Sequence, residues 1–216
     1  MGLRETKKVK MMQTVQREAL HLFADQGYEP TTVEQITAAA EVSTTTFYRY
    51  FSSKEDVVLY GGRSPVIDEV LEGRPDEESL PDAIRNALVA AVVDSVGSDR
   101  EDVLARLQLI FRVPSLRAAF SVQSQQNLDT FAGVLARRIG RTGEAGDSYL
   151  LRLAAALVIS SVNETIRYWA DHDGEPVLAD LVGQAVEAIR PVLEALDAEA
   201  AALREAEAGI EAGITV

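Results

Sequence analysis

The sequence predicts an all-α fold, with a small N-terminal module of three helices followed by a larger helical domain. Apolar residues recur three and four positions apart along most of the 216 residues, and the strict alternation typical of β-strands is absent from the sequence. Segments containing Gly, Pro and Ser separate the periodic stretches. In the larger domain these breaks predict helices at about residues 81–96, 99–112, 115–140, 147–171 and 177–206.

The first helix is expected to follow a loose basic arm at residues 1 to about 6 and to end at Gln26. Gly27 is expected to end it, because Gly adopts the left-handed conformation that closes many helices. Its apolar residues form one stripe at helical spacing. This stripe consists of Met12, Val15, Ala19, Leu22 and Phe23.

Residues 32–54 predict two short helices joined by a tight turn. Thr32 and Gln35 have the spacing of a capping box at the start of the first helix. Ser43 is expected to cap the second helix, which we expect to reach Phe51. The apolar sides of both helices, which we expect to pack against the first long helix, carry Val33, Ile36, Ala39, Ala40, Phe47 and Phe51.

The opposite face of the second short helix carries hydroxyls, a phenol and a guanidinium instead of the usual mixture of Glu and Lys. Such groups donate to phosphate oxygens or read base edges in a major groove. The pair of helices therefore suits a helix-turn-helix. A small helical hairpin whose hydroxyls only cap and solvate it is the alternative. The face consists of Thr44, Thr45, Thr46, Tyr48 and Arg49.

Two segments, Ala19 to Val33 and Val42 to Asp56, resemble TetR-family transcriptional regulators in order and spacing. The resemblance covers roughly residues 8 to 60. It implies a DNA-binding domain at residues 1–53, with the helix-turn-helix at about 33–52. Glu41 and Thr45 depart from the family pattern, because the family often has Gly at both positions. Glu41 therefore predicts strain in the turn, and Thr45 an altered base preference.

The resemblance also implies a function: a sequence-specific repressor that binds a palindromic operator on double-stranded DNA as a homodimer and is released by a small-molecule effector. Tyr48 and Lys54 are the expected phosphate contacts, Thr32 assists them, and Thr44 and Thr45 are the expected base readers. The complete set of expected DNA-binding residues is Arg4, Lys7, Lys8, Thr32, Ser43, Thr44, Thr45, Thr46, Tyr48, Arg49 and Lys54.

A connecting helix is expected at residues 54–72, capped by Ser53. Gly61 and Gly62 interrupt it, because each Gly costs about 1 kcal/mol in a helix relative to Ala. Ser64-Pro65 has the composition of a new helix start. This break is either a hinge between the two parts of the chain or a passive loop.

Residues 73–206 are expected to form a ligand-binding and dimerisation domain, with residues 207–216 as a disordered tail. The last helix carries a heptad seam, and the helix before it has a wide apolar face. Two such helices suit a four-helix bundle with a second copy of the chain, and a monomeric bundle is the alternative. The expected dimer interface consists of Leu157, Leu178, Val182, Ala185, Ile189, Val192 and Leu196.

Polar side chains among aromatic neighbours mark the expected effector pocket, which the resemblance places in this domain. A mainly apolar pocket with few polar anchors is typical of small-molecule sites. We expect the effector near Arg112 and Trp169, with an anionic or carbonyl-bearing end. The alternative is that these are ordinary surface or core residues. The expected pocket consists of Gln108, Phe111, Arg112, Phe120, Gln123, Asn163, Arg167 and Trp169.

The sequence lacks the residue patterns of catalysis. Its two histidines, His21 and His172, fall on separate helices, and no Gly-rich phosphate loop is present. The run at residues 171–173 (Asp-His-Asp) is better explained as a solvated helix end than as a metal site. We therefore expect no enzyme activity, no cofactor and no metal. The alternative function is a helical small-molecule-binding protein that no longer binds DNA.

Composition and charge are compatible with a cytoplasmic DNA-binding protein that does not associate with membranes. No cysteine is present, which excludes disulfides. The longest apolar run, near Ala154 to Ser161, is too short to span a bilayer, and no signal peptide is visible. The net charge is −13, but the first 17 residues carry five basic side chains and one acidic. Because salt screens charges beyond about 8–10 Å, the acidic remainder does not exclude DNA binding.

Overall fold

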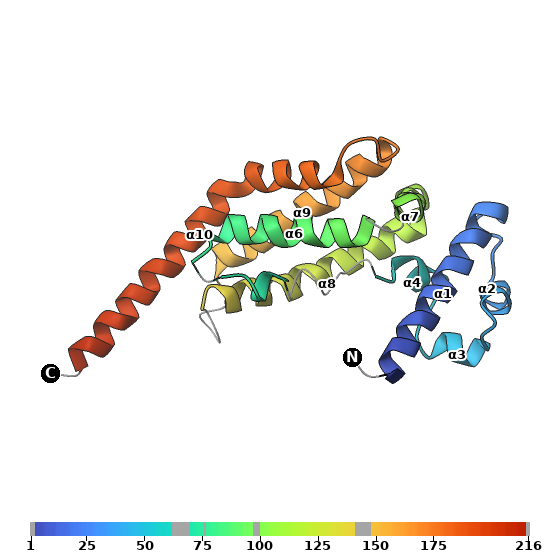
Figure 1. Cartoon of the computed structure of the whole chain (residues 1–216), viewed down its shortest axis with the longest axis horizontal. Helices are drawn as coiled ribbons and strands as arrows, with labels where there is room; N and C mark the ends of the chain where they lie inside the picture. The colour runs from blue at the N-terminus through green and yellow to red at the C-terminus, as the bar shows by residue number, and fades with distance from the viewer. Residues whose placement is uncertain (1–2, 62–69, 76, 97–99, 141–147, 215–216) are drawn as a thin grey trace. The chain divides into compact units, whose positions relative to one another are not determined.

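The computed structural model describes residues 3–61, 70–75, 77–96, 100–140 and 148–214, and every regular element within them is a helix. This confirms the all-α prediction. The helices run in the order shown in Figure 1. Their bounds are α1 Leu3–Gln26, α2 Val33–Ala39, α3 Thr44–Tyr48, α4 Lys54–Leu59, α6 Leu80–Val96, α7 Arg100–Arg112, α8 Pro114–Arg138, α9 Tyr149–Asp171 and α10 Leu178–Ile214.

The helices group into two compact units. The first comprises residues 1–63 together with 108–121, and the second comprises residues 64–107 together with 122–216. The segment 108–121, which contains the end of α7 and the start of α8, therefore groups with the N-terminal helices. The sequence pattern had placed this segment in the C-terminal domain.

In the first unit, α1 packs against α2 and α4, and α2 packs against α3. The core of this unit contains the α1 residues Val15, Ala19 and Phe23, which are buried as the apolar stripe predicted. Phe47 and Phe51 are also buried, with ring centroids 5.5 Å apart. This small core fixes which side of α3 faces the protein and leaves the other side to solvent.

Side-chain caps begin α2, α3 and α4, as predicted. Thr32 and Gln35 form a reciprocal capping box on α2. The Ser43 hydroxyl accepts from the backbone N–H of Thr46, and Ser53 caps α4 through the N–H of Asp56. Gly27 ends α1 with a φ of 89°. These caps satisfy N–H groups that otherwise lack partners at helix starts.

Two helix bounds in the first unit correct the predictions. Helix α1 already begins at Leu3, so residues 3–6 are helical and not a loose arm. Glu5 in its first turn pairs with Lys8 at 3.1 Å, and an acidic side chain is favourable at a helix start. Helix α3 ends at Tyr48, before the expected end at Phe51, although Phe51 N–H still bonds to the carbonyl of Phe47.

The turn of the helix-turn-helix contains a strained residue. Glu41 has a φ of 55°, which is the left-handed region that favours Gly. A side chain with a Cβ costs roughly 1–2 kcal/mol in this conformation. The left-handed backbone of Glu41 is the strain that the sequence predicts for this turn.

Helix α4 ends at Leu59, just before the break expected at Gly61 and Gly62, and helical structure is next described at residues 70–72. The Gln16 side chain donates to the carbonyls of Val57 and Tyr60 at 2.9 and 2.8 Å, which caps the end of α4. Gly61 has a φ of 75°. Gly62 and Ser64-Pro65 lie outside the described residues, and the hinge stays a prediction.

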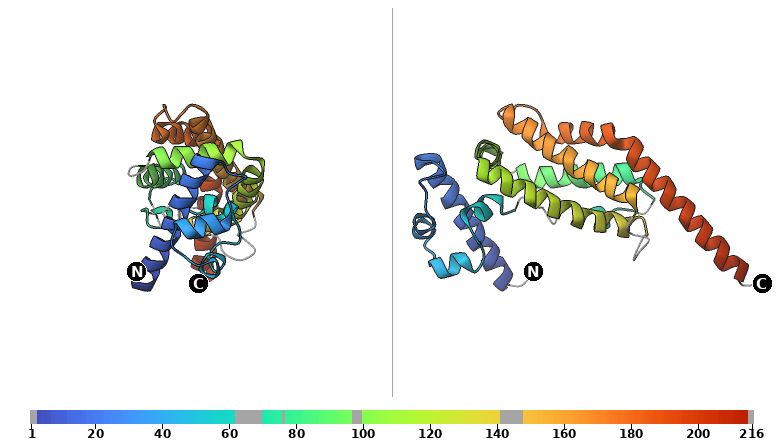
Figure 2. Two further views of the ribbon diagram at one scale, coloured as in Figure 1. Left: turned by 90° about the vertical axis from the view of Figure 1, so that its right-hand side faces the viewer. Right: turned by 180° about the vertical axis from the view of Figure 1, so that it is seen from behind.

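The second unit is built around α10, which packs along α9 and α6 (Figures 1 and 2). The core of this unit combines residues from α6, α8, α9 and α10, including Leu135 and Leu193. Helix α10 contains Pro191, where the ring removes one backbone hydrogen bond, and Figure 1 shows the helix changing direction along its length. Helix α10 continues to Ile214, so the disordered tail expected from residue 207 is wrong. The Ala- and Glu-rich composition there favours helix.

Helix α9 is the one described helix with the length and composition of a membrane span. The longest uninterrupted apolar run in the sequence, near Ala154 to Ser161, is too short to predict a membrane span. In the structure α9 packs against α10, and Ala154, Ala155 and Val158 are buried in the core. Other apolar residues on α9 remain partly exposed.

Candidate functional site

The outward face of α3 is polar, aromatic and accessible. Thr44, Thr45, Tyr48 and Arg49 are exposed, and the Tyr48 side chain retains 57% of its accessible surface. Phe47 lies fully buried on the opposite side of the same helix, with its ring edge-on to Tyr48 at 5.3 Å. Burial of Phe47 therefore orients the hydroxyl and phenol groups toward solvent, where they can meet a phosphate or a base edge.

Two of the expected DNA-binding hydroxyls, on Thr32 and Ser43, already serve as helix caps, and a third, on Thr46, is bonded to one of them. The Ser43 hydroxyl lies 2.9 Å from the Thr46 hydroxyl and accepts from its N–H at 3.0 Å. Thr32 accepts from the Gln35 N–H at 3.3 Å. These residues can still approach DNA because they are not buried, but their first role is to start α2 and α3.

The basic residues expected at the N-terminus lie on α1. Lys7 is exposed, and Lys8 pairs with Glu5. The side chain of Arg4 lies outside the described residues. Because α1 extends back to Leu3, these charges are arranged on a helix instead of a flexible arm.

Lys54 has contacts that the sequence did not reveal. Its ammonium donates to the backbone carbonyls of Tyr28, Glu29 and Thr31 at 2.8, 3.3 and 3.3 Å. It also lies 4.2 Å from the centroid of the Tyr28 ring. The sequence features that could have indicated these contacts are the aromatic residue Tyr28 in the turn and the basic residue Lys54 at the start of α4.

The Tyr28 hydroxyl, near Lys54, donates to the Glu55 carboxylate at 2.6 Å. Burial, and then this hydrogen bond, raise the pKa of Tyr28 above its ordinary value, while a hydrogen bond with Ser115 opposes the shift. Burial alone would raise the pKa of Glu55, but hydrogen bonds from Tyr28, its own backbone N–H and Ser53 lower it. Both groups therefore keep the charge states that favour the bond at neutral pH.

The residues expected to line an effector pocket divide between the two units. Gln108, Phe111, Arg112 and Phe120 belong to the first unit, where the Phe111 and Phe120 rings meet edge-to-face at 5.5 Å. Arg112 is exposed. Gln123, Asn163, Arg167 and Trp169 belong to the second unit.

Trp169 and Arg167 have structural roles that differ from the predicted pocket lining. Trp169 is 1% exposed, and its indole N–H donates to the carbonyl of Pro176 at 3.0 Å. The guanidinium of Arg100 lies 5.9 Å from the Trp169 ring centroid. Arg167 is exposed and pairs with Glu164 and Asp171. Trp169 is thus a core residue of the α9–α10 connection, and Arg167 is a surface residue.

The second unit contains partly buried polar side chains on α7, α8 and α9. Within the described part of the chain no donor reaches the buried Oε1 of Gln123. Asn163 on α9 donates to the hydroxyl of Ser124 on α8 at 3.1 Å. Burial lowers the pKa of Arg106 on α7. A buried acceptor without a donor costs about 1–3 kcal/mol, which a ligand with a suitable donor would recover.

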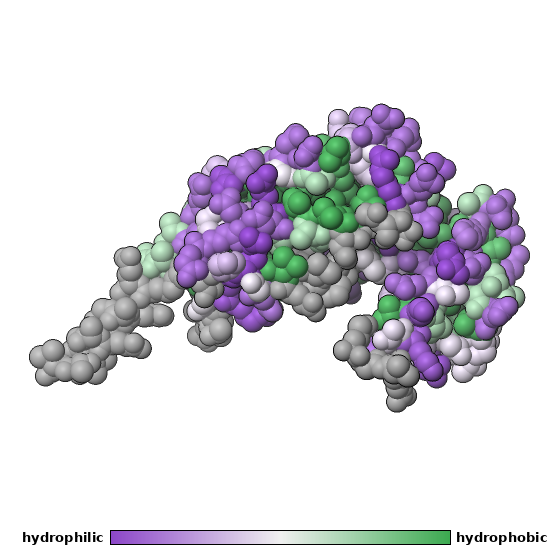
Figure 3. All heavy atoms as spheres, in the orientation of Figure 1, coloured by the Kyte–Doolittle hydropathy of each residue, from purple (hydrophilic) through white to green (hydrophobic). Residues whose placement is uncertain are grey.

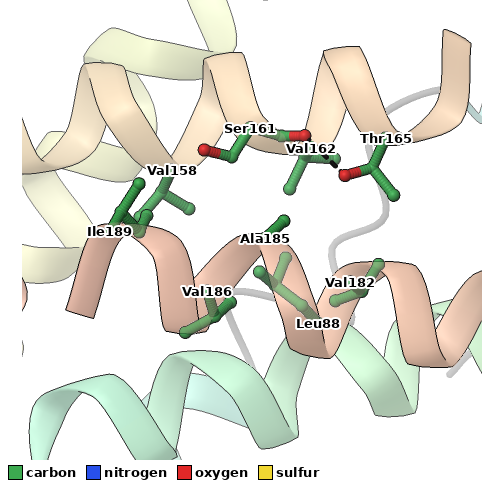
Figure 4. Close-up of a pocket in the computed structure, with 9 residues that line it drawn as sticks. All are labelled: Leu88, Val158, Ser161, Val162, Thr165, Val182, Ala185, Val186 and Ile189. Carbon is green, nitrogen blue, oxygen red and sulfur yellow. Dashed lines mark hydrogen bonds between the residues drawn. The ribbon is translucent and has the colours of Figure 1, made fainter. Parts of the chain in front are cut away.

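A narrow apolar crevice lies between α6, α9 and α10 in the second unit (Figure 4). It has essentially no volume that a water molecule could occupy, so its walls are in close packing contact. Leu88 lines it from α6, and the only hydrogen bond drawn there joins the Thr165 hydroxyl to the Ser161 carbonyl at 2.7 Å. The residues contributed by α9 and α10 are Val158, Ser161, Val162, Thr165, Val182, Ala185, Val186 and Ile189.

The seam expected to form a dimer interface is only partly available. Leu178, Val182 and Leu196 are buried in the core of their own chain, with exposures of 6%, 2% and 0%. Because α10 packs on α6 and α9, these three heptad residues are already covered within the chain. The remaining members are half-buried and are Leu157, Ala185, Ile189 and Val192. Figure 3 also shows apolar side chains gathered over α6 and α10.

Among the described residues no group of three or more His, Asp or Glu side chains is arranged to hold a metal ion. His172 stacks on Tyr168 with centroids 3.9 Å apart, and its Nδ1 lies 2.7 Å from the Tyr168 carbonyl. Its neighbour Asp173 has a φ of 52° in the turn after α9. These contacts suit a helix end.

Two family models match the chain. The model of bacterial regulatory proteins of the tetR family matches residues 17–60, and the model of the MftR C-terminal domain matches residues 78–194. The first match covers the end of α1, the helix-turn-helix and α4, and the second runs from α6 into α10.

Similar proteins include the HTH-type transcriptional regulator TcmR of Streptomyces glaucescens, which is 35% identical over 206 residues, covering 89% of this chain and 88% of that protein. The fatty acid metabolism regulator protein of Bacillus subtilis (strain 168) is 25% identical, covering 84% and 94% respectively. Among solved structures, Thermus thermophilus FadR in complex with lauroyl-CoA has a TM-score of 0.55 and 22% identity, covering 85% of this chain and 93% of that chain. This last likeness establishes the fold alone.

Proposed function

Because the chain belongs to the TetR family of bacterial regulatory proteins, we propose that it is a transcriptional repressor released from its operator by a small, largely apolar effector. It is a DNA-binding regulator that acts as a homodimer, as members of this family do. The observation that carries the DNA-binding role is the α3 face, where Thr44, Thr45 and Tyr48 are exposed opposite the buried Phe47.

The assignment of individual DNA contacts is part of this proposal. Thr44 and Thr45 lie on the first turn of α3, which is the part of a recognition helix that meets base edges. Tyr48 and Arg49 lie at its other end and suit phosphate oxygens. A two-fold symmetric protein reads two half-sites about one helical turn of DNA, roughly 34–36 Å, apart or a multiple of that distance, so the operator should be palindromic.

The function is tested by footprinting the purified protein on the DNA upstream of its own gene. We expect protection of a palindrome and an affinity that falls steeply with salt, since each neutralised phosphate contributes a slope of about 0.9. Thr45→Gly should change the base preferred at one position in each half-site without a general loss of affinity. A protein that binds small molecules but protects no DNA at any salt concentration would instead support the alternative function.

For the effector, the FadR structures supply probes of stated chemistry, because they contain lauroyl-CoA and stearoyl-CoA. A further similar structure, SmeT, contains triclosan, with 20% identity and a TM-score of 0.54. We propose that the effector of this chain is also mainly apolar and carries a hydrogen-bond donor for the Gln123 carbonyl. The support is the buried Oε1 of Gln123, which no donor reaches within the described residues.

Gln123→Met is expected to stabilise the free protein by about 1 kcal/mol, because it replaces an unsatisfied buried acceptor by an apolar group of similar length. The same substitution should weaken release of the operator by whichever probe, lauroyl-CoA or triclosan, acts on the unmodified protein. Chemical unfolding without ligand and operator titrations with ligand measure the two effects. Gln125→Met on the exposed side of α8 is the matched control and should stay within about 0.5 kcal/mol. Destabilisation by Gln123→Met would mean that its carbonyl is satisfied in solution.

A further inference from the structure

We infer that Lys54 is a positioning residue, which holds the α1–α2 turn in register for DNA binding and does not itself bind phosphate. The inference replaces the role that sequence resemblance gave to this lysine. It rests on the proposed function only because operator binding is one of the readouts.

The Lys54 ammonium has three N–H donors, and the structure places three acceptors around it. These are the carbonyl oxygens of Tyr28, Glu29 and Thr31, at 2.8, 3.3 and 3.3 Å. The side chain is half-buried. A phosphate oxygen would therefore have to displace at least one of these carbonyls.

The aromatic ring of Tyr28 makes a further contact with the Lys54 ammonium. The ammonium lies 4.2 Å from the ring centroid, within the range of a cation–π interaction. Tyr28 is 5% exposed, and its hydroxyl is fixed to Glu55 at 2.6 Å. The Tyr28 ring cannot rotate away without breaking that hydrogen bond. Lys54 therefore contacts a ring whose position is held by Glu55.

The position of Lys54 in the chain explains why these contacts affect DNA recognition. The turn that it binds, residues 28–31, leads directly into the Thr32 cap of α2. Lys54 itself is the first residue of α4. The ammonium thus links the segment just before α2 to the segment just after α3. These two segments are the entrance and the exit of the helix-turn-helix.

Two substitutions distinguish positioning from phosphate binding. Lys54→Met keeps most of the aliphatic stem and removes the donors, whereas Lys54→Arg keeps the charge but replaces the compact ammonium by a planar guanidinium. If Lys54 positions the turn, both variants should bind the operator about tenfold more weakly at every salt concentration, as expected for the loss of roughly 1.4 kcal/mol. The salt slope of Lys54→Met should equal that of the unmodified protein.

Arg49→Met is the matched control, because Arg49 is an exposed cation on the same DNA-binding module. Its slope should fall by about one if Arg49 binds a phosphate. A Lys54→Met slope that also falls by about one, together with normal binding by Lys54→Arg, would overturn the inference.

Lysine labelling of the unmodified protein gives an independent test that does not depend on folding of the variants. Reductive methylation followed by mass spectrometry should find Lys54 slow to react in the free protein and unchanged on operator binding. Lys7, which is exposed, should react readily in the free protein. Rapid labelling of Lys54 without DNA and protection only with DNA would contradict the positioning role. If the unmodified protein bound no operator, the proposed function would fail, while the labelling of free Lys54 would still test its contacts with the turn.

Discussion

Ile189→Arg is expected to convert the homodimer to a monomer and to weaken operator binding by roughly 100-fold or more, because paired binding modules gain about 10²–10⁴ in affinity over single ones. Ile189 is half-buried on α10 beside the apolar crevice that α9 lines (Figure 4). If Ile189 lies at the two-fold interface, as we propose, the substituted residue occurs there twice. Each buried guanidinium without a partner costs several kcal/mol.

Sedimentation velocity and operator titrations on the same preparations measure both effects. Gln184→Arg provides the control, because Gln184 is an exposed residue of α10 in the open groove beside Arg85, on a different side of the helix. This control should remain dimeric and bind the operator normally. An unmodified protein that sediments as a monomer while binding its operator tightly would refute the dimer model.

Gly174→Ala is expected to destabilise the second unit by about 2–5 kcal/mol, from left-handed strain of roughly 1–2 kcal/mol plus overpacking of about 1–3 kcal/mol. Gly174 has a φ of 72°. A Cβ at this position would lie 3.1 Å from Trp169 Cζ2 and 3.2 Å from Leu104 Cδ2. Because Trp169 is buried and held by its hydrogen bond to Pro176, the ring cannot move aside freely.

Gly140→Ala is the control that measures the left-handed backbone strain without the overpacking. Gly140 has a similar φ of 74°, but a Cβ there would meet no atom within 4 Å among the described residues. The control should therefore lose only about 1–2 kcal/mol. Thermal unfolding followed by Trp169 fluorescence measures both variants. Equal losses in the two proteins would mean that the Trp169 contact contributes nothing.

Residues 1–60 could be understood from the sequence because their determinants are local. Capping residues act on N–H groups two or three positions away, so Thr32, Ser43 and Ser53 identified three helix starts correctly. Phe47 and Phe51, four positions apart, had to share a buried face, and this orientation exposed Thr44, Thr45 and Tyr48. The polar face of α3 was thus implied before any tertiary contact was known.

The roles of residues in long-range contacts were decided only by the tertiary structure. A heptad seam shows that α10 has an apolar side, but not whether its own chain or a second copy covers that side. The structure buries Leu178, Val182 and Leu196 internally and leaves Ile189 and Val192 partly accessible. Trp169 likewise looked suited to a ligand, whereas its partners Arg100 and Pro176 make it part of the core.

Lys54 shows the physical reason for this division. Its charge and its place at the start of α4 are properties of the sequence, and both are compatible with a phosphate contact. Its three carbonyl partners lie 23–26 positions earlier in the chain. Hydrogen bonds over such separations depend on how α1 and α4 pack together, and no local pattern encodes that packing. The sequence by itself therefore determined the helices and the DNA-reading face, and the tertiary structure decided which polar groups were left free to act.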